Sequence, residues 1–207
     1  MDQRDVSPET LAAQGLGETD PVSGGLAPVI NLSTNYEQQP DGSYREGRVY
    51  TRADNPTSEH AEQLLAALEG GALEGGCVCA LFGSGMAAAT AVFQSLLPGD
   101  HVLVSRVLYW GVRKWLAEFA LTWGLDVEFT DTGDLAAVAA AIRPGRTRLL
   151  WVETPANPMW EITDLTAVCD LAHAAGVRVA VDNTVATPVL TRPFEFGADL
   201  VIHSASK

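Results

Sequence analysis

Short runs of β-branched and apolar residues alternate with alanine- and leucine-rich stretches from residue 77 to the end of the chain. The runs have the length and composition of strands, and the stretches between them are long enough for helices. The predicted strands are 77–82, 101–105, 126–130, 148–153, 177–182 and 200–203, and the predicted helices are 84–97, 111–123, 135–142 and 164–175. This alternation favours an α/β fold with a mostly parallel sheet covered by helices on both faces.

The first quarter of the chain has a different pattern. Residues 1–51 are rich in Gly, Pro, Asn and Gln and show no sustained period, which predicts an extended arm. Asn55-Pro56-Thr57 then offers a helix start, and Gly70-Gly71 would stop that helix. We therefore expect an N-terminal arm over 1–51 and a large domain over 52–207.

Composition and charge exclude several classes of function. Hydrophobic residues make up 47% of the 207 residues and charged residues 19%, which indicates a globular rather than a disordered chain. A net charge of −13 repels nucleic acid and anionic membranes. No apolar run reaches membrane-spanning length, the first five residues are too polar for a signal peptide, and the three cysteines cannot all pair. We expect a cytoplasmic protein with neither a nucleic-acid nor a membrane partner.

Chemically active side chains follow four of the predicted strands. In a parallel sheet, ligands bind beyond the carboxyl ends of the strands. If these strands are neighbours, one cleft is faced by Gly83-Ser84-Gly85-Met86, the segment from Glu153 to Asn157, Asp182-Asn183-Thr184, and the pair Ser204 and Lys207.

The last strand runs into two hydroxyls and a lysine. Ser204 and Ser206 can donate hydrogen bonds to a phosphate, and the amine of Lys207 can form a Schiff base with an aldehyde. A phosphate and an aldehyde on one small molecule describe pyridoxal 5'-phosphate (PLP). The alternative interpretation of this ending is a solvated strand terminus.

The glycine pair supports a rival interpretation. Gly83-x-Gly85-x-x-Ala88 follows a predicted strand and opens a predicted helix, as in a dinucleotide site, so an NAD(P)-dependent dehydrogenase is a second hypothesis. A dinucleotide site also requires an acidic residue at the end of the next strand, where it binds the ribose. Here the next strand ends in Ser105-Arg106, without a carboxylate.

Three further residues each have more than one interpretation. Asp182 could bind a metal or cap a helix, or it could pair with the pyridine nitrogen of PLP; a metal would lack ligands here, because only Glu153 and the isolated His203 are candidates. Tyr109 could pack in the core, or stack on a cofactor ring and exchange protons with substrate. Arg52 could be solvated, or could hold a phosphate with its fork of donors.

These motifs together resemble the Cys/Met-metabolism PLP-dependent enzymes, the family of cystathionine γ-synthase, cystathionine γ- and β-lyases, methionine γ-lyase and the homoserine sulfhydrylases. The similarity begins near Pro28 and reaches the last residue. Six segments match in the family's order: Tyr50-Thr-Arg52-Ala-Asp-Asn55-Pro-Thr57, Ser84-Gly-Met86-Ala, Leu108-Tyr109, Glu153-Thr-Pro-Ala-Asn157-Pro, Val181-Asp182-Asn-Thr184 and Ala198-Asp-Leu-Val-Ile-His-Ser-Ala-Ser-Lys207.

The resemblance implies a role for each matching residue near the end of the chain. Lys207 would carry the cofactor covalently and then act as the proton-transferring base. Ser204 and Ser206, together with the amides of Gly85 and Met86, would hold the phosphate.

The resemblance also implies how the ring is held. Asp182 would pair with the pyridine nitrogen, Asn157 would reach the ring hydroxyl, and Tyr109 would stack on the ring and take part in catalysis. The matching segments add Ser84 and Thr184 to the cofactor-binding set.

Two residues at the junction of the arm and the large domain would act in another subunit. By the same resemblance, Tyr50 and Arg52 would reach the phosphate of a neighbouring chain. This implies a homodimer or homotetramer with shared active sites.

The resemblance implies an aspartate-aminotransferase-like (fold type I) large domain that is incomplete at its C-terminus, with the family's C-terminal domain absent. The implied chemistry is elimination or replacement at the γ (or β) carbon of sulfur- or oxygen-substituted amino acids, as in cystathionine γ-synthase and γ-lyase. Within the family, the alternatives are cystathionine β-lyase and O-acylhomoserine sulfhydrylase. An inactive fragment is a further alternative outside it.

Besides its end at Lys207, the chain departs from the family pattern at two places. Ser206 stands where the family usually has Thr, which keeps the hydroxyl. Trp110-Gly111-Val112 replaces the common Gly-Gly-Thr and puts a bulky ring near the entrance. Methionine γ-lyases tend to have Cys at the position of Gly111, which argues against that activity.

Overall fold

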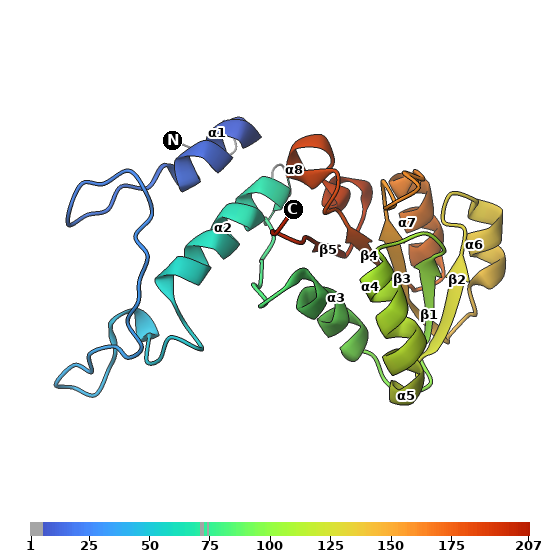
Figure 1. The fold of residues 1–207 in the computed structure, drawn as a ribbon, viewed down its shortest axis with the longest axis horizontal. Coiled ribbons are helices and arrows are strands. Elements are labelled where there is room, and N and C mark those ends of the chain that lie inside the picture. Colours follow the sequence, from blue (N-terminus) through green and yellow to red (C-terminus); the bar gives the residue numbers. More distant parts are fainter. Residues whose placement is uncertain (1–5, 71–72, 74) are drawn as a thin grey trace. The chain divides into compact units, whose positions relative to one another are not determined.

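The chain forms two compact units, Met1–Leu81 and Phe82–Lys207, in a computed structural model that describes residues 6–70, 73 and 75–207 (Figure 1). Two sequence expectations fall outside the described residues: the polar start at residues 1–5, and Gly71 as half of a helix stop.

The second unit is built on a parallel sheet with the strand order β2-β1-β3-β4-β5 among the described residues. Five of the six predicted strands are confirmed, each within one residue at either end. They are β1 (His101–Ser105), β2 (Asp126–Thr130), β3 (Thr147–Glu153), β4 (Arg178–Asp182) and β5 (Leu200–Ile202). The order reverses direction between β1 and β3, which is the kind of switch point where such sheets open a crevice for ligands.

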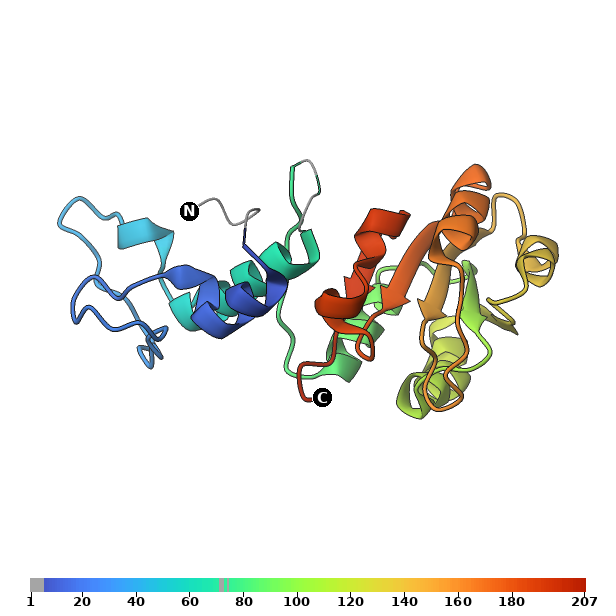
Figure 2. The same ribbon diagram turned by 90° about the horizontal axis from the view of Figure 1, so that it is seen from above.

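Helices cover both faces of this sheet, as predicted. Successive strand residues alternate between two buried clusters, because neighbouring side chains of a strand point to opposite faces. Val102 and Val104 belong to the cluster under α3 (Gly85–Gln94), α4 (Trp110–Trp115) and the π-helical η4 (Leu116–Ala120), which continues into α5 (Leu121–Trp123). Leu103 belongs to the cluster under α6 (Leu135–Ala141) and α7 (Leu165–Ala174). The two groups of helices lie on opposite sides of the sheet (Figure 2).

Short helical segments were not predicted from the pattern. In the second unit these are α8 (Thr187–Leu190) and the 3-10 helix η5 (Pro193–Phe196). In the first unit, α1 (Pro8–Gln14) lies in the stretch expected to be extended, with Ser7 as its cap and Leu11 buried. Seven residues hold only about two helical turns, too few for a visible period.

The long helix of the first unit was predicted. It is α2 (Pro56–Gly70), and α1 packs against it. The 3-10 segments η2 (Gly15–Gly17) and η3 (Arg45–Gly47) also belong to this unit. No helix in the described part of the chain combines the length and the apolar character needed to cross a membrane.

The expected strand over residues 77–82 does not form. The amide of Leu81 donates to the Glu62 side chain of α2 at 2.7 Å, and the thiol of Cys77 lies 3.2 Å from the carbonyl oxygen of Ala66. No neighbouring strand pairs with this segment among the residues that the structure describes. Alternating apolar residues favour a strand only where a ladder partner is present.

Candidate active site

The carboxyl ends of β1, β3, β4 and β5 share one edge of the sheet. Glu153 and Asp182, the last residues of β3 and β4, stand opposite each other in the parallel register. The N-terminus of α3 meets β5 at the same edge. The structure brings together here the predicted site residues of the second unit: Ser84, Gly85, Met86, Tyr109, Asn157, Asp182, Thr184, Ser204, Ser206 and Lys207.

Glycine at position 85 allows the start of α3 to touch the end of β5. A Cβ atom on Gly85 would lie 2.7 Å from both Cβ and Oγ of Ser204, closer than such atoms ever approach. Ser84 caps the helix by accepting the Ala87 amide at 3.0 Å. The hydroxyls of Ser204 and Ser206 lie 3.2 Å apart beside this helix start. Amides of a first helical turn and two hydroxyls form a site for an anion such as a phosphate.

Asp182 ends β4 in a largely desolvated position. Its Oδ1 accepts the amide of Thr184 at 3.0 Å, and the Thr184 hydroxyl accepts the amide of Ser204 at 2.9 Å. Burial raises the pKa of Asp182, while the Thr184 hydrogen bonds and nearby His203 act in the opposite direction. A carboxylate held in such a place is stabilised by a cationic partner.

Tyr109 lies over the start of α4. A Cβ atom on Gly111 would lie 2.6 Å from the Cε1 atom of the Tyr109 ring and 3.2 Å from the Met86 sulfur, so glycine leaves room for this ring. The ring of Trp110 has its centroid 5.9 Å from that of Tyr109, and its side chain is 67% exposed. Trp110 therefore adds an exposed aromatic surface beside Tyr109.

Glu153 has a position that the sequence did not reveal. It is only 4% exposed, and its two carboxylate oxygens accept the amide of Tyr109 at 2.6 Å and the amide of Asn157 at 2.8 Å. Burial raises the pKa of Glu153 to about 7; the two amide bonds oppose this shift, and the charge of Asp182 adds to it. In the sequence, Glu153 was recognisable only as an acidic residue at the end of a strand. That position alone does not distinguish a buried carboxylate from a solvated one.

Tyr50 and Arg52 belong to the first unit, so the structure does not place them at this edge. Their segment pairs with an earlier one: the amide of Thr51 donates to the carbonyl oxygen of Thr34 at 3.0 Å. The guanidinium carbon of Arg52 lies 5.1 Å from the centroid of the Tyr50 ring. Both side chains are exposed and available to a ligand or another chain.

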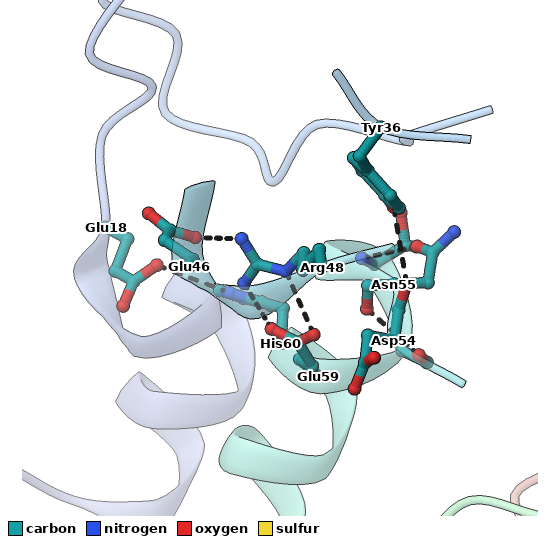
Figure 3. Close-up of polar contacts among 10 residues, drawn as sticks. Glu18, Tyr36, Glu46, Arg48, Asp54, Asn55, Glu59 and His60 are labelled. Atoms are coloured by element: carbon teal, nitrogen blue, oxygen red, sulfur yellow. Dashed lines mark hydrogen bonds and ion pairs between the residues drawn. The ribbon is translucent and has the colours of Figure 1, made fainter. Parts of the chain in front are cut away.

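The segment with Tyr50 and Arg52 is anchored on both sides (Figure 3). Before it, Arg48 binds Glu59 of α2 through two hydrogen bonds, one of them 3.1 Å from Nε to Oε1, and also pairs with Glu46. After it, Asn55 accepts the amide of Thr57 at 2.8 Å. The hydrogen bonds with Glu59 raise the pKa of Arg48, and those with Arg48 lower the pKa of Glu59.

A metal centre has no ligand set in the part of the chain that the structure describes, where no group of three or more His, Cys, Asp or Glu side chains could hold an ion.

Replacing Gly85 with alanine tests the contact between α3 and β5. Alanine normally favours a helix, but at this position its methyl group would clash with the Cα, Cβ and Oγ atoms of Ser204. We expect Gly85→Ala to lower the free energy of unfolding by about 1–3 kcal/mol. The matched control is Gly83→Ala, where nothing lies within 4 Å of the added atom. Urea unfolding measures both, and equal stabilities would contradict the packing described.

Glu153 gives the stability of the protein a defined pH dependence. The pKa of Glu153 is about 7 in the folded chain, against an ordinary value of 4.5, so between these two pH values the folded state binds a proton that the unfolded state has lost. The contribution of Glu153 is therefore full below pH 4.5 and declines as the pH rises to 7, by about 3 kcal/mol. We expect urea unfolding to show this decline for the wild type relative to Glu153→Gln. Parallel pH profiles would contradict a buried, titrating Glu153.

Known proteins resemble this chain along almost all of its length. It is 40% identical over 203 residues to the cystathionine gamma-synthase of Mycobacterium tuberculosis, covering 97% of this chain and 50% of that protein. It is 39% identical over 200 residues to the cystathionine gamma-lyase of Bacillus subtilis, with 96% and 51% covered. The crystal structure of metB from Corynebacterium glutamicum matches with a TM-score of 0.91 and 36% identity, over 100% of this chain and 52% of that one.

The fold and the cofactor follow from the family. The chain spans about half the length of the curated relatives it matches. Its parallel sheet and helices are those of the PLP-dependent fold type I, as expected, and membership of a PLP-dependent family excludes the alternative hypothesis of a nicotinamide dehydrogenase. Because the profile of the family described as "Cys/Met metabolism PLP-dependent enzyme" matches residues 9–207, this chain belongs to that family of PLP-dependent enzymes.

Proposed function

We propose that the chain carries the PLP site of an enzyme that eliminates or replaces a substituent at the γ carbon of a sulfur- or oxygen-substituted amino acid. The observation that carries the proposal is the close contact of Gly85 with Ser204, which would allow an anion to bind three residues before Lys207. Relatives named as a cystathionine gamma-synthase, a cystathionine gamma-lyase and an O-succinylhomoserine sulfhydrylase support this class of chemistry.

The donor set at the edge of the sheet fits PLP. Because Gly85 has no side chain, the first turn of α3 lies directly against Ser204, so its amides and the Ser204 hydroxyl could donate to the same phosphate. We assign the phosphate to Ser204, Ser206 and the amides of Gly85 and Met86, with Ser84 shaping the helix start. Thr184 supports both ends of the site, because it bonds to Asp182 and to Ser204.

The remaining residues would hold the ring and move protons. PLP supplies an electron sink for the negative charge that forms at the substrate's α carbon. Lys207 would hold the cofactor covalently at rest, and its free amine would remove the α proton of a bound substrate. Asp182 would keep the ring nitrogen protonated.

Two further residues would complete the hold on the ring. Asn157 would reach the ring hydroxyl, and Tyr109 would cover the ring and exchange protons with the substrate. Chemistry at the γ carbon requires an additional proton shift at the β carbon, which Lys207 and Tyr109 would share.

Within the family, two alternatives stay open: cystathionine β-lyase and O-acylhomoserine sulfhydrylase. A relative named cystathionine beta-lyase is 40% identical to the chain, and one named O-succinylhomoserine sulfhydrylase is 43% identical. Methionine γ-lyase chemistry is less favoured. The cysteine expected in those enzymes at position 111 would put a Cβ atom 2.6 Å from the Tyr109 ring in this structure.

We further propose that the active unit is a homodimer or homotetramer in which Tyr50 and Arg52 complete the site of a neighbouring chain. Their exposure in an anchored segment supports this, since an arginine fork is suited to binding phosphate. The three free thiols, one of them buried, are compatible with a reducing compartment, and we place the enzyme in the cytoplasm.

Lys207 can be tested as the covalent cofactor site because these 207 residues contain only one other lysine, Lys114. We expect full-length protein to be yellow with PLP, and borohydride to fix the cofactor on Lys207, as read by peptide mass spectrometry. Lys207→Ala should abolish both trapping and turnover. Lys114→Ala, the control, should retain both. Trapping on Lys114, or uptake of NAD by a colourless protein, would contradict the proposal.

Mixing two inactive variants tests the shared site. In a dimer of Arg52→Ala with Lys207→Ala, one site has both lesions and the other has neither, if Arg52 serves the partner chain. Random exchange should then restore about a quarter of wild-type activity, because half of the dimers are mixed and each has one intact site. Each variant exchanged with itself is the control. If mixing restores nothing, Arg52 serves its own chain.

A further inference from the structure

Glu153 joins two loops that leave neighbouring strands. Tyr109 lies in the loop after β1 and Asn157 in the loop after β3, and the amides of both donate to the same carboxylate, at 2.6 and 2.8 Å. The Glu153 amide in turn donates to the Ser105 hydroxyl at 3.3 Å. Glu153 therefore ties the ends of β1 and β3 together at the switch point of the sheet.

Burying the Glu153 carboxylate at this place is unfavourable in free energy, more so than a purely structural link between two loops requires. The side chain is 4% exposed and stands opposite Asp182, a second carboxylate, in the register of β3 and β4. Burying a carboxylate beside another requires compensation by hydrogen bonds. The two amide donors supply part of it, one to each oxygen.

A glutamate meets the geometric demand better than its closest substitutes. Two amides from different loops need two acceptor oxygens at fixed positions. Glutamine offers one acceptor oxygen, and its amide group donates instead. Aspartate keeps both oxygens but is one methylene shorter.

We propose that Glu153 is a positioning residue for the cofactor ring. Its two oxygens fix the spacing between the backbone at Tyr109 and the backbone at Asn157. The inference rests on the proposed function, in which Tyr109 stacks on the ring and Asn157 reaches the ring hydroxyl. Without the carboxylate, the two loops are no longer held at a fixed distance from each other. The side chains of Tyr109 and Asn157 would then be positioned less accurately against the ring.

The test compares Glu153→Gln and Glu153→Asp with wild type in the full-length holoenzyme. The readouts are the PLP dissociation constant and the visible circular dichroism of the bound cofactor, which reports how rigidly the ring is held. Both variants should bind PLP about tenfold more weakly, the equivalent of one lost hydrogen bond to a charged group. They should also show a smaller visible signal. Borohydride should still fix the cofactor on Lys207.

The matched control is Glu161→Gln, which removes a negative charge from the same loop. Glu161 pairs with Arg106 at 2.8 Å, and its side chain does not contribute to the bonds made by Glu153. This variant should bind PLP within about twofold of wild type.

The results separate this inference from the proposed function. Folded Glu153 variants with wild-type affinity and wild-type dichroism would overturn the positioning role while leaving the PLP site intact. If Glu153→Gln does not fold, Glu153→Asp, which keeps the charge, decides. A wild-type protein that binds no PLP would overturn the proposed function, and the inference with it.

Discussion

The rest of the site depends on two carboxylates in register at the ends of β3 and β4, of which Glu153 is buried and Asp182 is partly buried. Glu153 and Asp182 are in register at the edge where the strands end, and burial raises the pKa of both. Their surroundings limit the cost: amides of Tyr109 and Asn157 bond to one, and the amide of Thr184 to the other. Two acidic groups with so little water favour a cationic, hydrogen-bonding ligand between the adjoining loops. A protonated pyridine ring has that chemistry.

Two glycines give this edge its shape. Gly85 lets the start of α3 touch Ser204, and Gly111 leaves room for the ring of Tyr109. The first contact would form the phosphate end of the proposed site and the second the ring end. Both are close approaches of backbone that a single methyl group would prevent, so the site depends on packing as much as on its polar groups.

The sequence predicted the sheet closely and the site only in part. The central strands β1, β3 and β4 are largely buried on both faces, so their β-branched runs were recognisable within one residue at each end. The segment 77–82 had the same pattern without a partner, and α1 was too short to show a period. The roles proposed for Lys207 and Asp182 came from resemblance to a family. The role of Glu153 was hidden, because its hydrogen bonds join it to Tyr109, 44 residues away, and only the fold brings them together.

The protonation state of the cofactor's ring nitrogen tests this account most directly. It can be observed by nitrogen NMR with labelled PLP bound to the full-length protein. If Asp182 is the counter-charge at the edge of the sheet, the ring nitrogen stays protonated well above the pH at which it titrates in free PLP, and Asp182→Asn abolishes this shift. A ring nitrogen that titrates as in free PLP, or that is indifferent to Asp182→Asn, would contradict the account.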